Sequence, residues 1–261
     1  MVDLKELRKD IDIVDAELLT AFRKRFEITE KIGEYKAETN AELFCPEREE
    51  EKLDDLRKKL NDSEYAPYIV DLYKCIMDYS KYQQSNNIFG TKDIFLIGMP
   101  GCGKTTIGRL LADKMQRNFI DMDILFENTY KISPAKMIED KGEAFFRDSE
   151  TELLKKIVLK PHSQKDGDTI HARIISCGGG IVCRDDNKEL LKTNSIVCYI
   201  KRDLAKLTVK GRPLSQKNGI AALYDQRKEK YESWCDHIIE NDRTPNECAD
   251  RIISHIKEDN K

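Results

Sequence analysis

The stretch Ile94-Phe95-Leu96-Ile97-Gly98-Met99-Pro100-Gly101-Cys102-Gly103-Lys104-Thr105-Thr106 decides the fold of this 261-residue chain. Four apolar residues predict a buried strand, and the glycine-rich turn after them has the spacing G-x-x-x-x-G-K-T. An apolar-periodic run then predicts a helix, so strand, turn and helix come in the order that a phosphate-binding loop requires. The glycines let successive backbone N–H groups and the helix N-terminus face a polyphosphate. The stretch therefore predicts a site for a nucleoside triphosphate.

This loop supplies the residues predicted to bind the nucleotide. Lys104 would reach the outer phosphates, and the Thr105 hydroxyl would bind Mg²⁺. The alternative is a glycine-rich turn without a ligand, which the flanking strand and helix disfavour. The residues of this loop expected to contact the nucleoside triphosphate are Gly98, Gly101, Cys102, Gly103, Lys104, Thr105 and Thr106.

Length, charge and cysteine usage limit the class of protein. The length accommodates two domains. Charged residues make up 36% of the chain, but the net charge is only −3, so no nucleic-acid or membrane partner is expected. The N-terminus lacks the apolar segment of a signal peptide, and no run approaches the roughly eighteen apolar residues of a membrane span. The eight cysteines are scattered without a C-x-x-C pair, which favours reduced thiols over a zinc site and predicts a cytoplasmic protein.

The N-terminal third predicts an all-helical domain. Residues 3–35 contain no proline, and apolar residues recur every three or four positions, which predicts one very long amphipathic helix. A second helix is expected from Pro46 to about Leu60, and a third, capped by residues 61–63, to about Gln84. Two shorter helices cannot cover the whole apolar stripe of a long one. We therefore expect a homodimer through the N-terminal helices.

A polar break at residues 85–92 predicts a domain boundary. The expected division is a helical domain at 1–87, a linker at 88–92 and a second domain at 93–261. Beyond the break, predicted strands at 94–97, 119–122, 174–176, 196–200 and 237–239 alternate with helices or loops. This alternation predicts an α/β domain with a five-stranded parallel sheet and helices on both faces. Residues 160–168 are expected to form a polar surface loop.

Several polar residues are expected at one edge of that sheet, because ligands of open parallel sheets bind beyond the carboxyl ends of the strands. Asp121 and Asp123 end the second strand, and the triplet 178–180 follows the third. Three glycines permit a small substrate to approach the backbone. Arginines 147, 212 and 227 lie in segments that could fold over the same edge. Taken singly, each feature has a plainer explanation as a surface charge or a turn.

Taken together and in order, the motifs resemble those of shikimate kinases over about residues 94–256. They are G-M-P-G-C-G-K-T, F-I-D-M-D, G-E-A-F-F-R-D-S-E, I-I-S-C-G-G-G, G-R-P-L and L-Y-D-Q-R-K-E-K-Y. Adenylate and gluconate kinases share the phosphate loop but lack this combination. The resemblance implies the phosphorylation of shikimate to shikimate 3-phosphate by ATP with Mg²⁺. A kinase for a different small metabolite is the alternative.

The resemblance also implies a role for each matching residue. Lys104 would stabilise the transferring phosphoryl group, and Asp121 would help Thr105 to hold the metal. Asp123 would hydrogen-bond the attacking hydroxyl as the candidate base. The shikimate site would further contain Arg147, Arg227, Gly178, Gly179 and Gly180, with Glu150 behind the arginines, which suit a carboxylate. Arg212 would close over the phosphates on a lid. The segment 203–216 is shorter than the usual lid, and Cys177 replaces a small non-thiol residue.

Polar residues interrupt the apolar stripe of the N-terminal helices. Arg25 lies on the face of Phe22 and Ile28, and Lys36 follows Ile32 by one turn. Buried cations are costly unless they are paired or meet an anionic ligand. On periodicity alone, acidic neighbours would pair these cations within a dimeric helical arm.

The motifs L-R-K-D-I-D-I-V-D, R-K-R-F-E-I-T-E-K-I-G-E-Y-K, P-E-R-E and I-M-D-Y-S-K-Y-Q-Q resemble those of all-helical chorismate mutases over residues 3–84. The resemblance implies an intertwined dimer that rearranges chorismate to prephenate without a cofactor. Such a site holds a dianion in its compact shape and places positive charge at the ether oxygen. The residues it implies are Arg8 from the other protomer, Arg25, Lys36, Cys45, Arg48, Glu49, Ser80 and Gln84. Cys45 stands where relatives often have Asp, and a thiol caps a helix poorly.

The sequence thus predicts a bifunctional enzyme of aromatic amino acid biosynthesis with two independent sites. The alternative is a shikimate kinase whose N-terminal part is a non-catalytic dimerisation arm or a sensor of chorismate or prephenate. An enzyme, a sensor and an arm would respond differently to substitution of Arg25.

Overall fold

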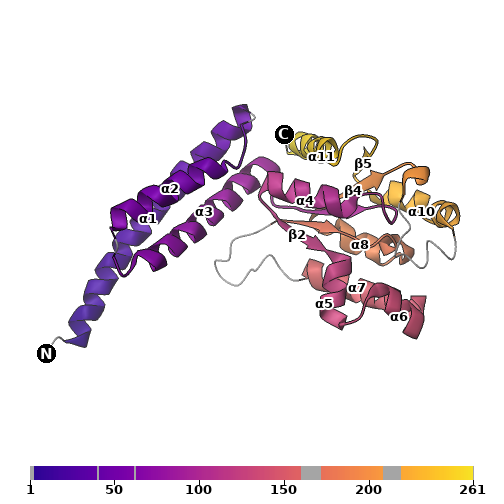
Figure 1. Cartoon of the computed structure of the whole chain (residues 1–261), viewed down its shortest axis with the longest axis horizontal. Helices are drawn as coiled ribbons and strands as arrows, with labels where there is room; N and C mark the ends of the chain where they lie inside the picture. Colours follow the sequence, from indigo (N-terminus) through magenta and orange to yellow (C-terminus); the bar gives the residue numbers. More distant parts are fainter. Residues whose placement is uncertain (1–2, 40, 62, 160–171, 208–218, 261) are drawn as a thin grey trace. The chain divides into compact units, whose positions relative to one another are not determined.

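The computed structural model describes residues 3–39, 41–61, 63–159, 172–207 and 219–260. The chain forms two compact units, Met1–Ile88 and Phe89–Lys261, whose elements follow the chain order in Figure 1. Within the described ranges, every helix is too short or too polar to cross a membrane. All eight cysteines lie in these ranges, and each is a free thiol.

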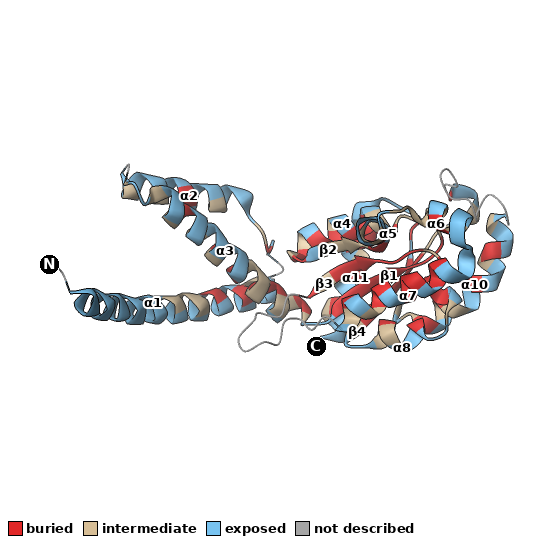
Figure 2. Cartoon of the chain, turned by 90° about the horizontal axis from the view of Figure 1, so that it is seen from below, coloured by how far each residue is buried: buried red, intermediate tan, exposed pale blue. Residues whose placement is uncertain are grey.

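Three helices form the first unit: α1 (Leu4–Thr39), α2 (Pro46–Leu60) and α3 (Ala66–Phe89). The predicted helical domain is confirmed. Its small core contains Leu53, Val70 and Met77 from α2 and α3. Helix α1 buries only Thr29 and Gly33, and Figure 2 shows most of its length exposed.

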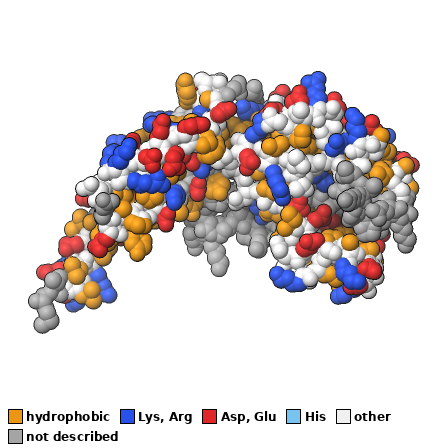
Figure 3. Space-filling view, in the orientation of Figure 1, with side chains coloured by type: hydrophobic (Ala, Val, Ile, Leu, Met, Phe, Trp, Pro, Cys, Tyr) orange, Lys and Arg blue, Asp and Glu red, His pale blue; other side chains and the backbone are white. Residues whose placement is uncertain are grey.

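The apolar stripe of α1 is uncovered. Its large side chains are 44% to 64% exposed, and hydrophobic side chains are visible along this helix in Figure 3. We call these residues the α1 stripe: Leu4, Leu7, Ile11, Val14, Leu18, Ile28, Ile32 and Tyr35. The apolar face of this amphipathic helix is therefore not buried within a single chain.

Helix α3 is longer than its sequence predicts. The polar run from Ser85 indicates an end near Gln84, but the helix continues to Phe89. Ser85 and Phe89 are both buried, so packing overrides the low helix propensity of the two asparagines between them. The helix ends at Gly90, whose φ of +71° is the left-handed conformation that terminates helices.

The second unit is built on a five-stranded parallel sheet in the order β2-β3-β1-β4-β5. The strands are β1 (Asp93–Ile97), β2 (Asn118–Asp121), β3 (Arg173–Ser176), β4 (Ser195–Lys201) and β5 (His237–Glu240). The predicted parallel sheet is confirmed. Strand β1 is central and buried at every position. Because all strands run the same way, their carboxyl ends meet at one edge.

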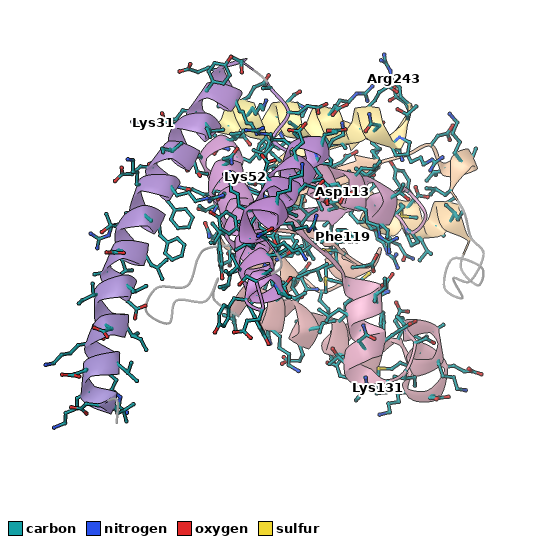
Figure 4. The ribbon with its side chains drawn as sticks, turned by 60° about the vertical axis from the view of Figure 1, so that its left-hand side comes forward. Lys31, Lys52, Asp113, Phe119, Lys131 and Arg243 are labelled. Carbon is teal, nitrogen blue, oxygen red and sulfur yellow. The ribbon has the colours of Figure 1, made fainter. Side chains whose placement is uncertain are left out.

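Helices cover both faces of this sheet. Helix α4 (Lys104–Met115) packs on β1, β2 and β3 and against α11 (Pro245–Asp259). A Cβ on Gly108 of α4 would lie 2.5 Å from the ring of Phe119, which Figure 4 labels, so glycine is what lets α4 approach β2. Contacts to β4 come from α8 (Asn187–Lys192) and α10 (Ile220–Trp234). The remaining helices are α5 (Met122–Tyr130), α6 (Pro134–Lys141), α7 (Glu143–Leu159) and two short 3₁₀ turns, Ile181–Cys183 and Leu204–Lys206.

Candidate active sites

The glycine-rich turn between β1 and α4 is tightly wrapped. Gly98 and Gly103 have φ values of +140° and +105°, and Gly101 has +80°. A Cβ on Gly98 would lie 2.5 Å from the carbonyl oxygen of Ile200 on the neighbouring strand. Only glycine combines this conformation with so close an approach. The loop delivers the chain into α4 with its first backbone N–H groups unpaired within the helix, as an anion site requires.

The predicted phosphate-binding lysine lies over this loop. Lys104 is buried, and its Nζ donates hydrogen bonds to the carbonyl oxygens of Gly98 (2.9 Å) and Met99 (3.0 Å). Cys102 is buried in the loop beside it, and Thr106 lies exposed in the first turn of α4. The loop's own carbonyls thus hold the ammonium group at the phosphate-binding face.

A hydroxyl and a carboxylate meet next to the loop. The Thr105 Oγ1 atom donates to Asp121 Oδ2 at 2.7 Å. The other carboxylate oxygen of Asp121 accepts the backbone N–H groups of Asp123 (3.0 Å) and Ile124 (3.4 Å), which caps α5. This capping explains why the strand ends at Asp121, one residue earlier than its apolar pattern predicts. Hydroxyl and carboxylate oxygens are ligands that suit Mg²⁺.

A buried ion pair lies on α7, near the glycine triplet. The Nη1 of Arg147 is 2.8 Å from the Glu150 carboxylate, and its Nη2 is 3.1 Å from Glu143. A Cβ on Gly180 would overlap the Arg147 guanidinium, and a Cβ on Gly178 would overlap Glu150. Because the glycines of the triplet have no side chains, Arg147 and Glu150 can lie directly against its backbone. Asp123 is exposed, and its Oδ1 lies near Gly178 too.

Burial changes the acid–base properties of this cluster. It raises the pKa of Glu150, and the Arg147 guanidinium opposes that shift. It also raises the pKa of the Cys177 thiol, which precedes the triplet and is buried. The Nε atoms of Arg147 and Arg227 are buried and have no hydrogen-bond partner within the described part of the chain. Two guanidinium groups with spare donors can bind an anion.

Two side chains of α10 bind the middle glycine of the triplet. The carbonyl oxygen of Gly179 accepts the Nη1 of Arg227 at 3.1 Å and the hydroxyl of Tyr231. A Cβ on Gly179 would lie 2.6 Å from the ring of Pro100, so the triplet packs directly on the phosphate-binding loop. The sequence motif contains Tyr231, but nothing in the pattern indicates that its hydroxyl reaches Gly179.

Asn241, which follows β5, is a further residue that the sequence does not single out. It is buried, and its Nδ2 donates to the carbonyl oxygen of Cys102 at 2.7 Å. It also lines a pocket of about 350 Å³ beside η2 and β5 with Lys201, Arg202, Tyr224 and Asp242. Arg212, predicted on the lid, lies outside the described residues, as do 160–168 and most of the lid.

In the helical unit, Arg25 and Ser80 lie together. The Arg25 Nη1 donates to the Ser80 hydroxyl and to the Ile76 carbonyl at 3.4 Å. The Nε2 of Gln84 donates to the Ser80 carbonyl at 3.3 Å, while its buried Oε1 has no partner among the described residues. A Cβ on Gly33 would lie 3.3 Å from the Gln84 side chain. Arg25 is half-buried, and this burial lowers its pKa. Among the described residues, no carboxylate lies in hydrogen-bond contact with it.

Lys36 lies further along α1. Its Nζ donates to the carbonyl oxygen of Leu43 at 2.8 Å. Burial lowers the pKa of Lys36, and the nearby Cys45 and Glu49 oppose that shift. Cys45 occupies the N-cap of α2 without a side-chain capping bond. Helix α2 therefore has the weak N-cap that is expected of a thiol.

Two of the predicted mutase residues, Arg8 and Arg48, are not brought into this cluster, and a third, Glu49, lies near Lys36 but pairs with another cation. Arg8 is exposed on α1, seventeen residues before Arg25, which is about 25 Å along a helix. Arg48 is exposed and pairs with Glu51. Glu49 pairs at 3.3 Å with Lys81, a cation that the sequence pattern does not single out.

Comparison with known families assigns both units. A family model for shikimate kinase matches residues 100–257, and one for chorismate mutase type II matches residues 7–85. The shikimate kinase of Clostridium botulinum (strain Eklund 17B / Type B) is 39% identical over 171 residues, which cover 63% of this chain and 94% of that protein. The shikimate kinase of Bacillus subtilis (strain 168) is 30% identical over 175 residues, covering 64% and 89%.

Solved structures agree with this similarity. A shikimate kinase from Acinetobacter baumannii in complex with shikimate matches with a TM-score of 0.60 and 27% identity, covering 67% of this chain and 98% of that one. A shikimate kinase from Aquifex aeolicus matches with a TM-score of 0.53 and 26% identity, covering 64% and 98%.

Proposed function

The chain belongs to the shikimate kinase family and carries a chorismate mutase type II domain, and on that premise we propose two reactions, one in each unit. The second unit transfers the γ-phosphoryl group of ATP to a hydroxyl of shikimate. The first unit rearranges chorismate to prephenate. The observation that carries the kinase assignment is the packing of the Gly179 backbone on Pro100, because it joins the acceptor-binding triplet to the phosphate-binding loop.

The acceptor side of the kinase site is suited to a carboxylate. Arg147 and Arg227 are both buried, and the Nε atom of each has no hydrogen-bond partner among the described residues. A shikimate carboxylate would accept from these guanidinium groups in a planar, fork-like geometry. Glu150 would keep Arg147 in place by its 2.8 Å ion pair. The side-chain-free surface of the triplet would let the ring approach the backbone.

On the donor side, the loop amides and Lys104 would bind the phosphates of ATP. Lys104 would exchange the carbonyls of Gly98 and Met99 for phosphate oxygens. The acceptor hydroxyl oxygen attacks the γ-phosphorus, the bond to ADP breaks, and an oxygen of Asp123 accepts the hydroxyl proton. Thr105 and Asp121 fit a magnesium site, since their oxygens meet at 2.7 Å beside the loop. The metal would neutralise charge on the phosphates. Arg212 would add positive charge there.

The helical unit is suited to a dianion that needs no acid–base chemistry. Arg25 is partly buried, and within the described structure it bonds only to neutral oxygens of Ser80 and Ile76, so a substrate carboxylate would compensate its charge. Lys36 and Gln84 would donate to the ether oxygen as its bond to carbon breaks. Arg48, Glu49 and Cys45 would border the ring, with Glu49 accepting from the ring hydroxyl.

The mutase site would be completed by a second copy of this chain. The α1 stripe is exposed in a single chain, and soluble monomers rarely leave a contiguous apolar surface of this extent. Arg8 lies about 25 Å along the same helix from Arg25, so it cannot reach Arg25 in its own chain. In an antiparallel pairing of two α1 helices, each Arg8 would serve the partner's site.

The test is an assay of both reactions on purified full-length protein and on two variants. We expect wild type to convert chorismate to prephenate and to phosphorylate shikimate. Arg25→Ala should abolish the first reaction and retain the second, while Arg147→Ala should do the reverse. If wild type binds chorismate without turnover, the helical unit is a sensor. If it does not bind chorismate, the unit is a dimerisation arm.

A further inference from the structure

Tyr231 occupies a position between the two halves of the kinase site. It is fully buried on α10, and its ring stacks on Tyr199 of β4 with centroids 5.1 Å apart. Its hydroxyl donates to the carbonyl oxygen of Gly179 and lies 3.9 Å from the Met99 sulfur in the phosphate-binding loop. One hydroxyl thus contacts both the acceptor triplet and the donor loop.

The Gly179 carbonyl has a direct geometric connection to the substrate site. A trans peptide is planar, so this carbonyl and the N–H of Gly180 belong to one plane and point in opposite directions. Fixing the carbonyl therefore fixes the direction of the Gly180 N–H. Gly180 is the residue against which the Arg147 guanidinium lies. Arg227 shares the same carbonyl, one turn before Tyr231.

We propose that Tyr231 is a positioning residue for shikimate binding: its hydroxyl orients the Gly179–Gly180 peptide and the Arg227 guanidinium against the phosphate-binding loop. This inference rests on the proposed kinase function. Tyr231 itself touches no substrate in this account. Burial raises the pKa of Tyr231 although the nearby Arg227 opposes the shift, so the hydroxyl keeps the proton that it donates at neutral pH.

The test compares two hydroxyl deletions within one aromatic pair of the full-length chain. Tyr231→Phe removes the bond to Gly179 and keeps the stacked ring. Tyr199→Phe is the matched control: it also removes a buried hydroxyl, which interacts with Tyr224 rather than with the triplet. We expect Tyr231→Phe to raise the KM for shikimate roughly tenfold, the loss of about one hydrogen bond. The KM for ATP should stay within about twofold, and Tyr199→Phe should leave both constants within about twofold.

Each other outcome overturns the inference. An unchanged shikimate KM in Tyr231→Phe shows that the hydroxyl positions nothing. A parallel rise in the KM for ATP, a matching effect of Tyr199→Phe, or a variant that does not fold shows a general structural role. Failure of the proposed function is distinguishable, because wild type itself would then not phosphorylate shikimate. In that case the inference falls with the function on which it rests.

Discussion

The Arg147 guanidinium lies 2.8 Å from the Glu150 carboxylate, one turn along the same helix, and both side chains are buried. A buried pair of this kind is costly to break, because the remaining charge is left without compensation. Arg147 has a second partner, Glu143, at 3.1 Å. That carboxylate is much more exposed than Glu150. The two glutamates therefore differ in burial while sharing one arginine.

We predict that Glu150→Gln raises the KM for shikimate by roughly tenfold, because it removes the charge that holds Arg147 in place. The matched control is Glu143→Gln, which should change the KM by less than about threefold, as exposed pairs contribute little. Steady-state kinetics with varied shikimate measures both. Equal effects of the two substitutions would contradict the role given to the buried pair.

A second prediction concerns the space beside the same arginine. Gly180 has a φ of −104°, which alanine adopts without strain. An added methyl group would overlap the Arg147 guanidinium and push it from the acceptor site. Gly180→Ala should lower kcat/KM for shikimate about a hundredfold, which corresponds to about 2.7 kcal/mol, with little change in the KM for ATP. A normal kcat/KM would show that Arg147 does not have to lie against the triplet.

Asn241 provides the corresponding test on the nucleotide side. Its Nδ2 holds the Cys102 carbonyl of the phosphate-binding loop at 2.7 Å, and the Cys248 thiol lies 3.3 Å from its Oδ1. Asn241→Ala leaves that carbonyl without its partner, so we expect a rise of about tenfold in the KM for ATP. The KM for shikimate should stay within about twofold, the reverse of the result expected for Tyr231→Phe. A change in shikimate KM alone would refute this assignment.

Local sequence signals account for the elements and for the residues at the sheet edge. The stretch from Ile94 to Thr106 predicts strand, loop and helix because each is determined by neighbours in the chain. Strand β2 is predicted from its apolar run, but it ends at Asp121, one residue before the predicted end, because the Asp121 side chain caps α5. The order of the strands in the sheet cannot be predicted from such local signals, because the alternation of strands and helices along the chain does not reveal which strands pair.

The contacts that sequence could not predict are those between distant residues. Tyr231 and Gly179 are 52 positions apart, and Asn241 and Cys102 are 139 apart. In the sequence, neither side chain stands out, because one is a typical buried aromatic ring and the other is a polar residue after a strand. The end of α3 at Phe89 is a similar case, because burial of Phe89 in the second unit outweighs the polar run before it.

A fourth prediction uses the titration of Lys36. Burial lowers its pKa, so the amine loses its proton at a lower pH than an ordinary lysine, which titrates near about 10.4. In the proposed mutase site this cation lies at the ether oxygen, and the rate should therefore fall as pH rises through the lowered pKa. In Lys36→Arg the falling limb should move to higher pH, since a guanidinium stays charged. The pH–rate profile of the residual chorismate turnover measures this. A limb at the same pH in both proteins would assign it to another group.

The last prediction tests the proposed dimer independently of the kinase activity. Leu18 lies in the middle of the α1 stripe and is 46% exposed in one chain. Leu18→Glu would place an unpaired carboxylate in the proposed interface, which strongly disfavours association. We expect the molar mass in solution to fall from about 60 kDa, twice the 30.2 kDa of one chain, to that of the monomer.

Chorismate turnover should fall with it by at least about tenfold, because Arg8 would no longer reach the partner's site. Phosphorylation of shikimate should stay within about twofold, since the described kinase residues all lie in the second unit. The control is Lys31→Glu, at a position that is also exposed on the same helix but is not part of the stripe (Figure 4); this variant should keep the dimer and both activities. A wild type that is monomeric and still rearranges chorismate would show that each chain builds its mutase site alone.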